Sequence, residues 1–262
     1  MSDVSYEQAE TAAPEVRPYA KGEEPFALRL SNALRWFVDK VGKAASWLAL
    51  PLVIVTVIDV VARKLTWRDV ELNDVVGLQP WLIKHFGAVF GSTLLQELEW
   101  HFHAALFALV LGYGYINNTH VRVDLVRETL SFRKKAWIEF LGTTFFMIPY
   151  CLIVAYFAYI YAYDSYTVHE VSASTVGLSH RWIIKSVLVI GLLVAACAGI
   201  AVWLQTVLLL WGDPNRRFEL MTVEWPEEEG SKIEGKERIR LEDAPDVLAQ
   251  RTAELKRQAE GG

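Results

Sequence analysis

Four stretches of the chain are apolar on every side of a helix, and each approaches the length that crosses a bilayer. They cover residues 44–62, 98–116, 137–163 and 182–211. About 20 largely apolar residues span a hydrocarbon core about 30 Å thick, whereas a helix at the surface of a soluble domain keeps a polar face. We therefore predict an all-α integral membrane protein whose membrane domain, residues 44–211, contains four transmembrane helices.

The segment before the first span has a different pattern. Over residues 26–43, apolar and charged positions alternate at helical spacing, as in Leu34, Arg35 and Val38. One apolar face and one charged face are typical of a helix that lies in a membrane surface. We expect an N-terminal amphipathic interfacial helix here, on the cytoplasmic side. Residues 1–25 are polar and acidic, and we expect them to be disordered.

The connection between the first two spans, residues 63–97, is long. Its run 75–90 is apolar, but Gly77, Pro80 and Gly87 interrupt it and leave it too short to cross a bilayer. We expect this run to form an interfacial or re-entrant segment on the outer side.

Basic residues are distributed unevenly between the two sides. The chain is 53% hydrophobic, and the acidic excess behind its net charge of −5 lies in the tails. Connections rich in Lys and Arg face the cytoplasm, so we expect both termini, including the charged tail 212–262, on that side. The basic residues assigned to it are Arg29, Arg35, Lys40, Lys43, Arg122, Arg127, Arg133, Lys134, Lys135, Arg216 and Arg217. On the other side, Arg63, Lys64, Arg68 and Lys84 are diluted by Asp69, Glu71 and Asp74.

Few ionisable residues lie within the predicted spans. Asp59 stands four residues before Arg63, so the two side chains share one face of a helix and can neutralise each other. This spacing favours a structural pair or a subunit contact over a proton relay.

The richest polar cluster opens the second span and contains Glu97, Glu99, His101 and His103. Histidines ligate metal ions and haem, but residues two apart project from nearly opposite sides of a helix and do not reach one ion comfortably. Interfacial polar residues are the favoured interpretation. A haem-bearing membrane anchor of an oxidoreductase stays open as the alternative, although the third and fourth spans have no histidine in their interiors to act as a second ligand.

Other signals of chemistry are weak. Gly112 and Gly114 permit close helix packing and lack the context of a phosphate-binding loop. We find no Walker motif, zinc spacing or catalytic triad sequence. Cys151 and Cys197 fall in predicted spans and are interpreted as small apolar residues. We therefore predict no catalytic, cofactor or metal site, and no enzyme.

Five short strings, taken in order, resemble the small membrane subunit (Q type) of tripartite ATP-independent periplasmic (TRAP) transporters. They are DVVAR at 59–63, QELEWH at 96–101, AALF at 104–107, HVRVD at 120–124 and GLSHRWIIK at 177–185. The outer connection and both tails are longer than is usual in that family.

The resemblance implies a location in the bacterial inner membrane and two protein partners. In that family a large membrane subunit holds the substrate and sodium sites and moves as an elevator, while a periplasmic substrate-binding protein delivers the solute. The small permease subunit anchors and scaffolds the large one during ion-coupled uptake, most commonly of organic acids. No cofactor and no nucleic-acid partner are implied.

We assign candidate subunit contacts to the polar and glycine residues of these strings and of the adjoining spans. They are Asp59, Arg63, Glu97, Glu99, His101, His103, Gly112, Gly114, His120, Arg122, Asp124, Arg181 and Lys185.

Overall fold

A computed structural model describes residues 17–19, 22–69, 74–119, 130–174, 177–223 and 225. The chain divides into a unit of residues 1–223 and a second unit of residues 224–262. Every helix and strand described below belongs to the first unit.

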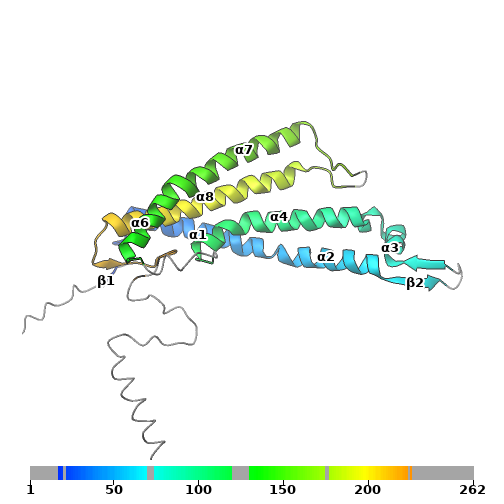
Figure 1. The fold of residues 1–262 in the computed structure, drawn as a ribbon, viewed down its shortest axis with the longest axis horizontal. Helices are drawn as coiled ribbons and strands as arrows, with labels where there is room; N and C mark the ends of the chain where they lie inside the picture. The colour runs from blue at the N-terminus through cyan, green and yellow to red at the C-terminus, as the bar shows by residue number, and fades with distance from the viewer. Residues whose placement is uncertain are drawn as a thin grey trace, which may run out of the picture. The chain divides into compact units, whose positions relative to one another are not determined.

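Helices dominate this unit (Figure 1). The α-helices are α1 (Phe26–Ser46), α2 (Ala49–Lys64), α3 (Leu78–Phe86), α4 (Ser92–Ile116), α6 (Phe132–Gly142), α7 (Ile148–Thr167) and α8 (Trp182–Trp211). A 3-10 turn, η1 (Ala88–Phe90), precedes α4, and a π turn, η2 (Thr143–Met147), joins α6 to α7. Two small sheets complete the unit: β1 (Arg17–Pro18) pairs parallel with β4 (Arg216–Arg217), and β2 (Thr66–Asp69) pairs antiparallel with β3 (Asp74–Gly77).

The fold is therefore mostly helical and not all-α, because the connection after α2 contains a hairpin. In the segment predicted as interfacial or re-entrant, β3 leads directly into α3 and η1. A short two-stranded hairpin satisfies its backbone groups outside the helical bundle.

Helix α8 is the centre of the bundle, and α1, α4 and α7 pack against it. Its buried face is built mainly from small residues, which let neighbouring backbones approach closely. Val38 of α1 and Ile116 of α4 meet Val194, Ala198 and Val202 of α8 in the main core cluster. Figure 1 shows α7 running beside α8 and α4 running beside α2.

Two prolines explain irregularities that the hydropathy pattern did not predict. The break between α1 and α2 falls at Trp47 and Leu48, because Pro51 has no N–H to bond the Trp47 carbonyl. The π turn η2 precedes Pro149, which likewise cannot donate to the carbonyl four residues earlier. The helical path nevertheless continues through each irregularity. The α1–α2 pair forms one long rod, Phe26–Lys64, and α6, η2 and α7 form another, Phe132–Thr167.

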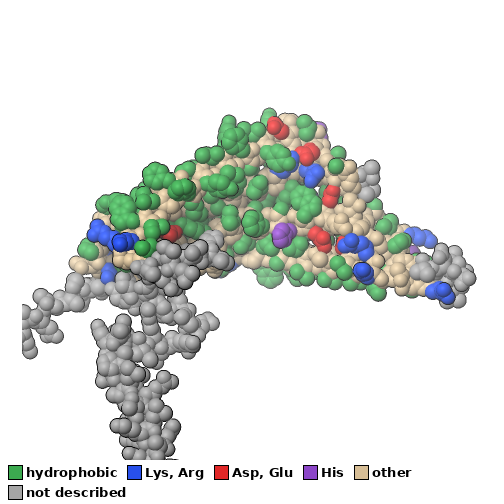
Figure 2. All heavy atoms as spheres, viewed as in Figure 1, with side chains coloured by type: hydrophobic (Ala, Val, Ile, Leu, Met, Phe, Trp, Pro, Cys, Tyr) green, Lys and Arg blue, Asp and Glu red, His purple; other side chains and the backbone are tan. Residues whose placement is uncertain are grey.

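Large apolar side chains face outward over most of the bundle. Figure 2 shows hydrophobic side chains covering the visible face, with charged side chains gathered near the helix ends. On α2 the outward apolar residues include Val53, Val57 and Val60, and on α7 they include Phe157 at 63% exposure. An exterior of this kind is stable against lipid and unstable against water.

Three helices within the described residues are long and apolar enough to cross a membrane: Phe26–Lys64, Phe132–Thr167 and Trp182–Trp211. Helix α4 has 25 residues, but its early turns carry the Gln96–His103 polar residues, which lower its mean hydropathy. The fourth crossing and the membrane-surface position of the first helix therefore stay predictions.

The contact between α4 and α8 is closest at two glycines. A Cβ atom placed on Gly191 would lie 2.5 Å from the backbone oxygen of Ala108, and one placed on Gly112 would lie 3.1 Å from the backbone oxygen of Val194. Gly112 thus packs inside this chain, as its predicted role in helix packing requires.

We predict that Gly191→Ala separates α4 from α8, because the atoms that meet the new methyl group belong to backbone. The expected destabilisation is about 1–3 kcal/mol. Gly142→Ala is the matched control, since nothing lies within 4 Å of its added Cβ, and it should gain about 0.5–1 kcal/mol in helix stability. Thermal unfolding in detergent measures both variants. Equal midpoints would contradict close packing at Gly191.

Candidate subunit-contact site

Two of the strings noted in the sequence meet at the predicted outer end of the bundle. The carboxylate of Glu97, in α4, accepts hydrogen bonds from the Ser172 hydroxyl and from the Leu178 backbone N–H. Both donors belong to the connection between α7 and α8. One side chain therefore ties the start of α4 to a loop 75 to 81 residues further along the chain.

Cationic side chains complete this outer polar cluster, which we define as Glu97, Trp100, Glu170, Arg181 and Lys185. The Arg181 guanidinium lies 5.4 Å from the centre of the Trp100 ring. Lys185 forms an ion pair with Glu170, and its Nζ atom lies 3.6 Å from the centre of the Tyr161 ring. Cation and ring attract each other because the face of an aromatic ring is electron-rich. The connection is thus held to α4, α7 and α8.

The two carboxylates of this cluster are stabilised in their ionised forms. Partial desolvation raises the pKa of Glu97, but the hydrogen bonds from Ser172 and Leu178, together with the charge of Arg181, outweigh it and hold the pKa below its ordinary value. The hydrogen bond from Lys185 is the main cause that lowers the pKa of Glu170. Both groups are therefore charged at neutral pH and act as acceptors only.

The two histidines at the start of the second predicted span have different surroundings. His101 is half-buried, with its Nδ1 atom 2.6 Å from the backbone oxygen of Glu97 and its ring centre 4.0 Å from that of Trp100. His103 is exposed. Within the part of the chain that the structure describes, no group of three or more His, Cys, Asp or Glu side chains is arranged to hold a metal ion.

A second tie joins α2 to α4. Asp59 is fully buried and forms an ion pair with Arg63, and the Ser92 hydroxyl donates a hydrogen bond of 3.2 Å to the second carboxylate oxygen of Asp59. Both oxygens thus have partners within the chain. This geometry supports the structural pair expected from the spacing of Asp59 and Arg63.

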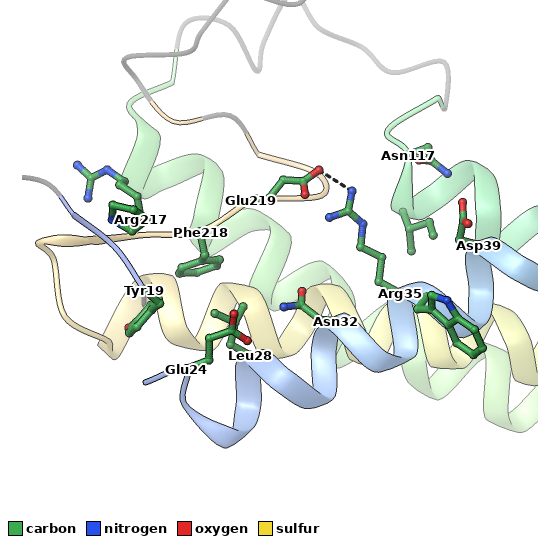
Figure 3. A pocket seen from close by; sticks show the side chains of 13 residues that line it. Tyr19, Glu24, Leu28, Asn32, Arg35, Asp39, Asn117, Arg217, Phe218 and Glu219 are labelled. Atoms are coloured by element: carbon green, nitrogen blue, oxygen red, sulfur yellow. Dashed lines mark hydrogen bonds and ion pairs between the residues drawn. The ribbon is translucent and has the colours of Figure 1, made fainter. Parts of the chain in front are cut away.

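A cavity of about 570 Å³ lies at the opposite end of the bundle, where residues 216–219 fold back over α1 (Figure 3). Arg35 of α1 points toward Glu219 and forms an ion pair of 2.6 Å with it. The buried Gln205 side chain of α8 bonds to the backbone oxygen of Glu219 at 3.0 Å and to the Met221 N–H at 3.1 Å. Its lining contains three carboxylates, Glu24, Asp39 and Glu219, and two guanidinium groups, Arg35 and Arg217, so the cavity has a small acidic excess.

The remaining candidates are placed as follows. Glu99 is half-buried on α4. The backbone oxygen of Gly114 accepts bonds of 3.0 Å from both the N–H and the hydroxyl of Thr119, which closes the end of α4. His120, Arg122 and Asp124 lie outside the described residues. The sequence did not predict the contacts made by Ser92, Ser172 and Glu170, or the fold-back of residues 216–223. A local sequence pattern does not indicate which distant residue a side chain will contact.

A comparison with protein-family models decides the family. The model of the DctQ component of tripartite ATP-independent periplasmic transporters matches residues 52–209. This chain belongs to the DctQ family. The match runs from α2 through nearly all of α8, and so includes both the outer polar cluster and the Asp59–Arg63 pair. Searches of curated proteins and of solved structures returned no match.

Membership places the chain in a transporter and in a membrane. The DctQ family is a transporter component and not an enzyme family, and a component of a tripartite transporter works with other proteins. The alternative of a haem-bearing anchor receives no support from this match. In this DctQ-family chain, α1 and residues 212–223 lie outside the matched region.

We predict that Glu97→Gln weakens the attachment of the α7–α8 connection in a pH-dependent way. A depressed carboxylate pKa contributes stability that is fully present above the unfolded value, about 4.3, and is lost as the pH falls through the lower folded value. The wild type should therefore unfold at a higher temperature than the variant from pH 8 to pH 5.

The difference in unfolding temperature should shrink at lower pH, where Glu97 becomes protonated. Glu99→Gln, two residues away on α4, is the matched control. A difference between wild type and Glu97→Gln that stayed constant down to pH 3 would show that the charge of Glu97 does not hold the connection.

Proposed function

We propose that this DctQ-family chain is the small permease subunit that anchors and scaffolds the large, elevator-type membrane subunit of a TRAP transporter. In this proposal the complex takes up an organic acid, the commonest solute class of the family, against its gradient with sodium as the coupling ion. A periplasmic substrate-binding protein delivers the solute. The chain itself does not line the solute path.

The observation that carries the scaffold role is that three polar side chains, each on a different helix, are hydrogen-bonded to another part of this chain. Asp59 joins α2 to α4, Glu97 joins α4 to the α7–α8 connection, and Ser31 of α1 donates a 2.8 Å hydrogen bond to the backbone oxygen of Ala201 in α8. A solute path needs polar groups whose hydrogen-bond donors or acceptors are available to the solute. A static support needs helices locked to one another, and these ties lock them.

The register of α4 supports its role as a fourth crossing. Glu97, Ala108 and Gly112 of α4 lie beside Leu178, Gly191 and Val194 in and before α8, so the two helices run parallel and in step. A helix that runs parallel to α8 at the same depth crosses the membrane wherever α8 does. Four crossings would bring both termini to one side, and the positive-inside pattern supports the cytoplasm as that side.

One face of α4 is the best candidate for contact with the large subunit. Glu99, His103 and Phe107 are spaced four residues apart and so line one face. His103 is exposed and Phe107 is 68% exposed. Outward polar side chains in a membrane helix are more stable against protein than against lipid. In the proposal, this face docks on the large subunit.

We predict that Phe107→Ala lowers the amount of large subunit that co-purifies with this chain in mild detergent. A central aromatic contact contributes more than about 1 kcal/mol, which corresponds to about fivefold or more in affinity. Phe157→Ala is the matched control, because Phe157 is 63% exposed but lies on α7. It should leave recovery unchanged.

Uptake by Phe107→Ala should fall in proportion to assembly, and the order of preferred solutes should stay the same. Two results would contradict the proposal. Equal recovery with both variants would remove this face of α4 as the contact, and a changed solute preference would place the chain in the solute path.

A further inference from the structure

An exposed aromatic cluster stands at the end of α2, outside the helical bundle. Trp67 of β2 lies 6.5 Å from Trp81 of α3, between ring centres, and Trp81 stacks on His85 at 4.4 Å. Trp81 also lies 6.0 Å from Phe86, which lies 5.9 Å from Phe90. We call these five residues the hairpin aromatic cluster.

The described chain leaves most of the apolar side chains in and around this cluster unburied. Helix α3 has nine residues and buries none of them, although they include Leu78, Trp81 and Phe86. Isolated helices shorter than about 12–15 residues are marginal in water, and most helices in proteins are stabilised by packing of an apolar face. Phe86 is 62% exposed and Val89 is 58% exposed. Something outside the described chain must cover these side chains.

The position of the cluster indicates what surrounds these apolar side chains. The outward apolar surface of α2 runs through Val57, Val60 and Val61 to Leu65, which is 52% exposed. The backbone oxygen of Leu65 accepts a 2.8 Å hydrogen bond from the N–H of Leu78, so α3 begins where this surface ends. The aromatic side chains therefore continue the apolar surface of a candidate membrane span.

The side chains also match the chemistry of a bilayer surface. Tryptophan prefers the boundary between headgroups and acyl chains, where its ring is apolar and its N–H finds polar partners. Exposed Lys64, Arg68 and Lys84 flank the aromatic residues, and long cationic side chains at this depth reach the headgroup phosphates. A protein partner would not need the cluster to start at the end of a lipid-facing helix.

We propose that β2, β3 and α3 form an anchor in the outer leaflet, with the hairpin aromatic cluster inserted at the boundary between headgroups and acyl chains. The anchor holds the outer end of α2 at a fixed depth. It rests on the orientation proposed above, with both termini in the cytoplasm, and it does not depend on the scaffold role.

Site-directed spin labelling of the full chain in phospholipid nanodiscs tests the anchor. Cys151 and Cys197 are free and are first replaced by serine, and Phe86→Cys then carries the label. Accessibility to oxygen, which concentrates in lipid, is compared with accessibility to a water-soluble nickel chelate. Phe157→Cys on α7 is the lipid-exposed reference, and Val168→Cys, 71% exposed in the α7–α8 connection, is the aqueous reference.

The label at position 86 should be more accessible to oxygen than to the nickel chelate, as at position 157. Preferential access to the chelate, as at position 168, would overturn the anchor. Protection that arises only after addition of the large subunit or the binding protein would also overturn it, and would assign the cluster to a protein partner. Neither result bears on whether the chain supports transport.

Discussion

No water is available in a hydrocarbon core to satisfy a polar group, and the architecture of this chain follows from that constraint. Backbone groups are satisfied within long helices, and buried polar side chains such as Ser31, Asp59 and Gln205 pair with other side chains or with backbone. Asp59 and Glu97 have partners at both carboxylate oxygens. Helices that cannot rely on the hydrophobic effect against lipid are instead joined by close backbone packing, as at Gly191, and by these hydrogen-bonded ties.

The same constraint supports the proposed role of the bundle as a scaffold. Helix α8 contacts α1, α4 and α7 through small residues, and the connection before it is fixed to α4 by Glu97 and to α7 and α8 by Lys185. No described polar side chain of these ties is left free to bind a solute. In the proposed role, the apolar exterior and the proposed outer anchor would hold the unit at one depth while the large subunit moves.

Hydropathy alone predicted much of this fold, because the need to match a bilayer acts on local sequence. The stretch 182–211 coincides with α8, and 137–163 lies within the rod formed by α6, η2 and α7. The hairpin after α2 was not predicted, since its short strands lack a clear alternation. The ties of the candidate site were also missed, because the Glu97–Ser172 pair depends on tertiary packing across 75 residues. What the sequence did indicate was that QELEWH and GLSHRWIIK belong to one family pattern, and the structure brings the two strings into contact.

Reconstituted uptake tests the central claim most directly. Proteoliposomes carrying this chain alone, the large membrane subunit with the binding protein, or all three components are compared for solute uptake under an imposed sodium gradient. The account predicts full uptake only when all three components are present, and none from this chain alone. Uptake by the isolated chain, or full uptake by the other two components without it, would contradict a scaffold that supports the transport machinery without forming the solute path.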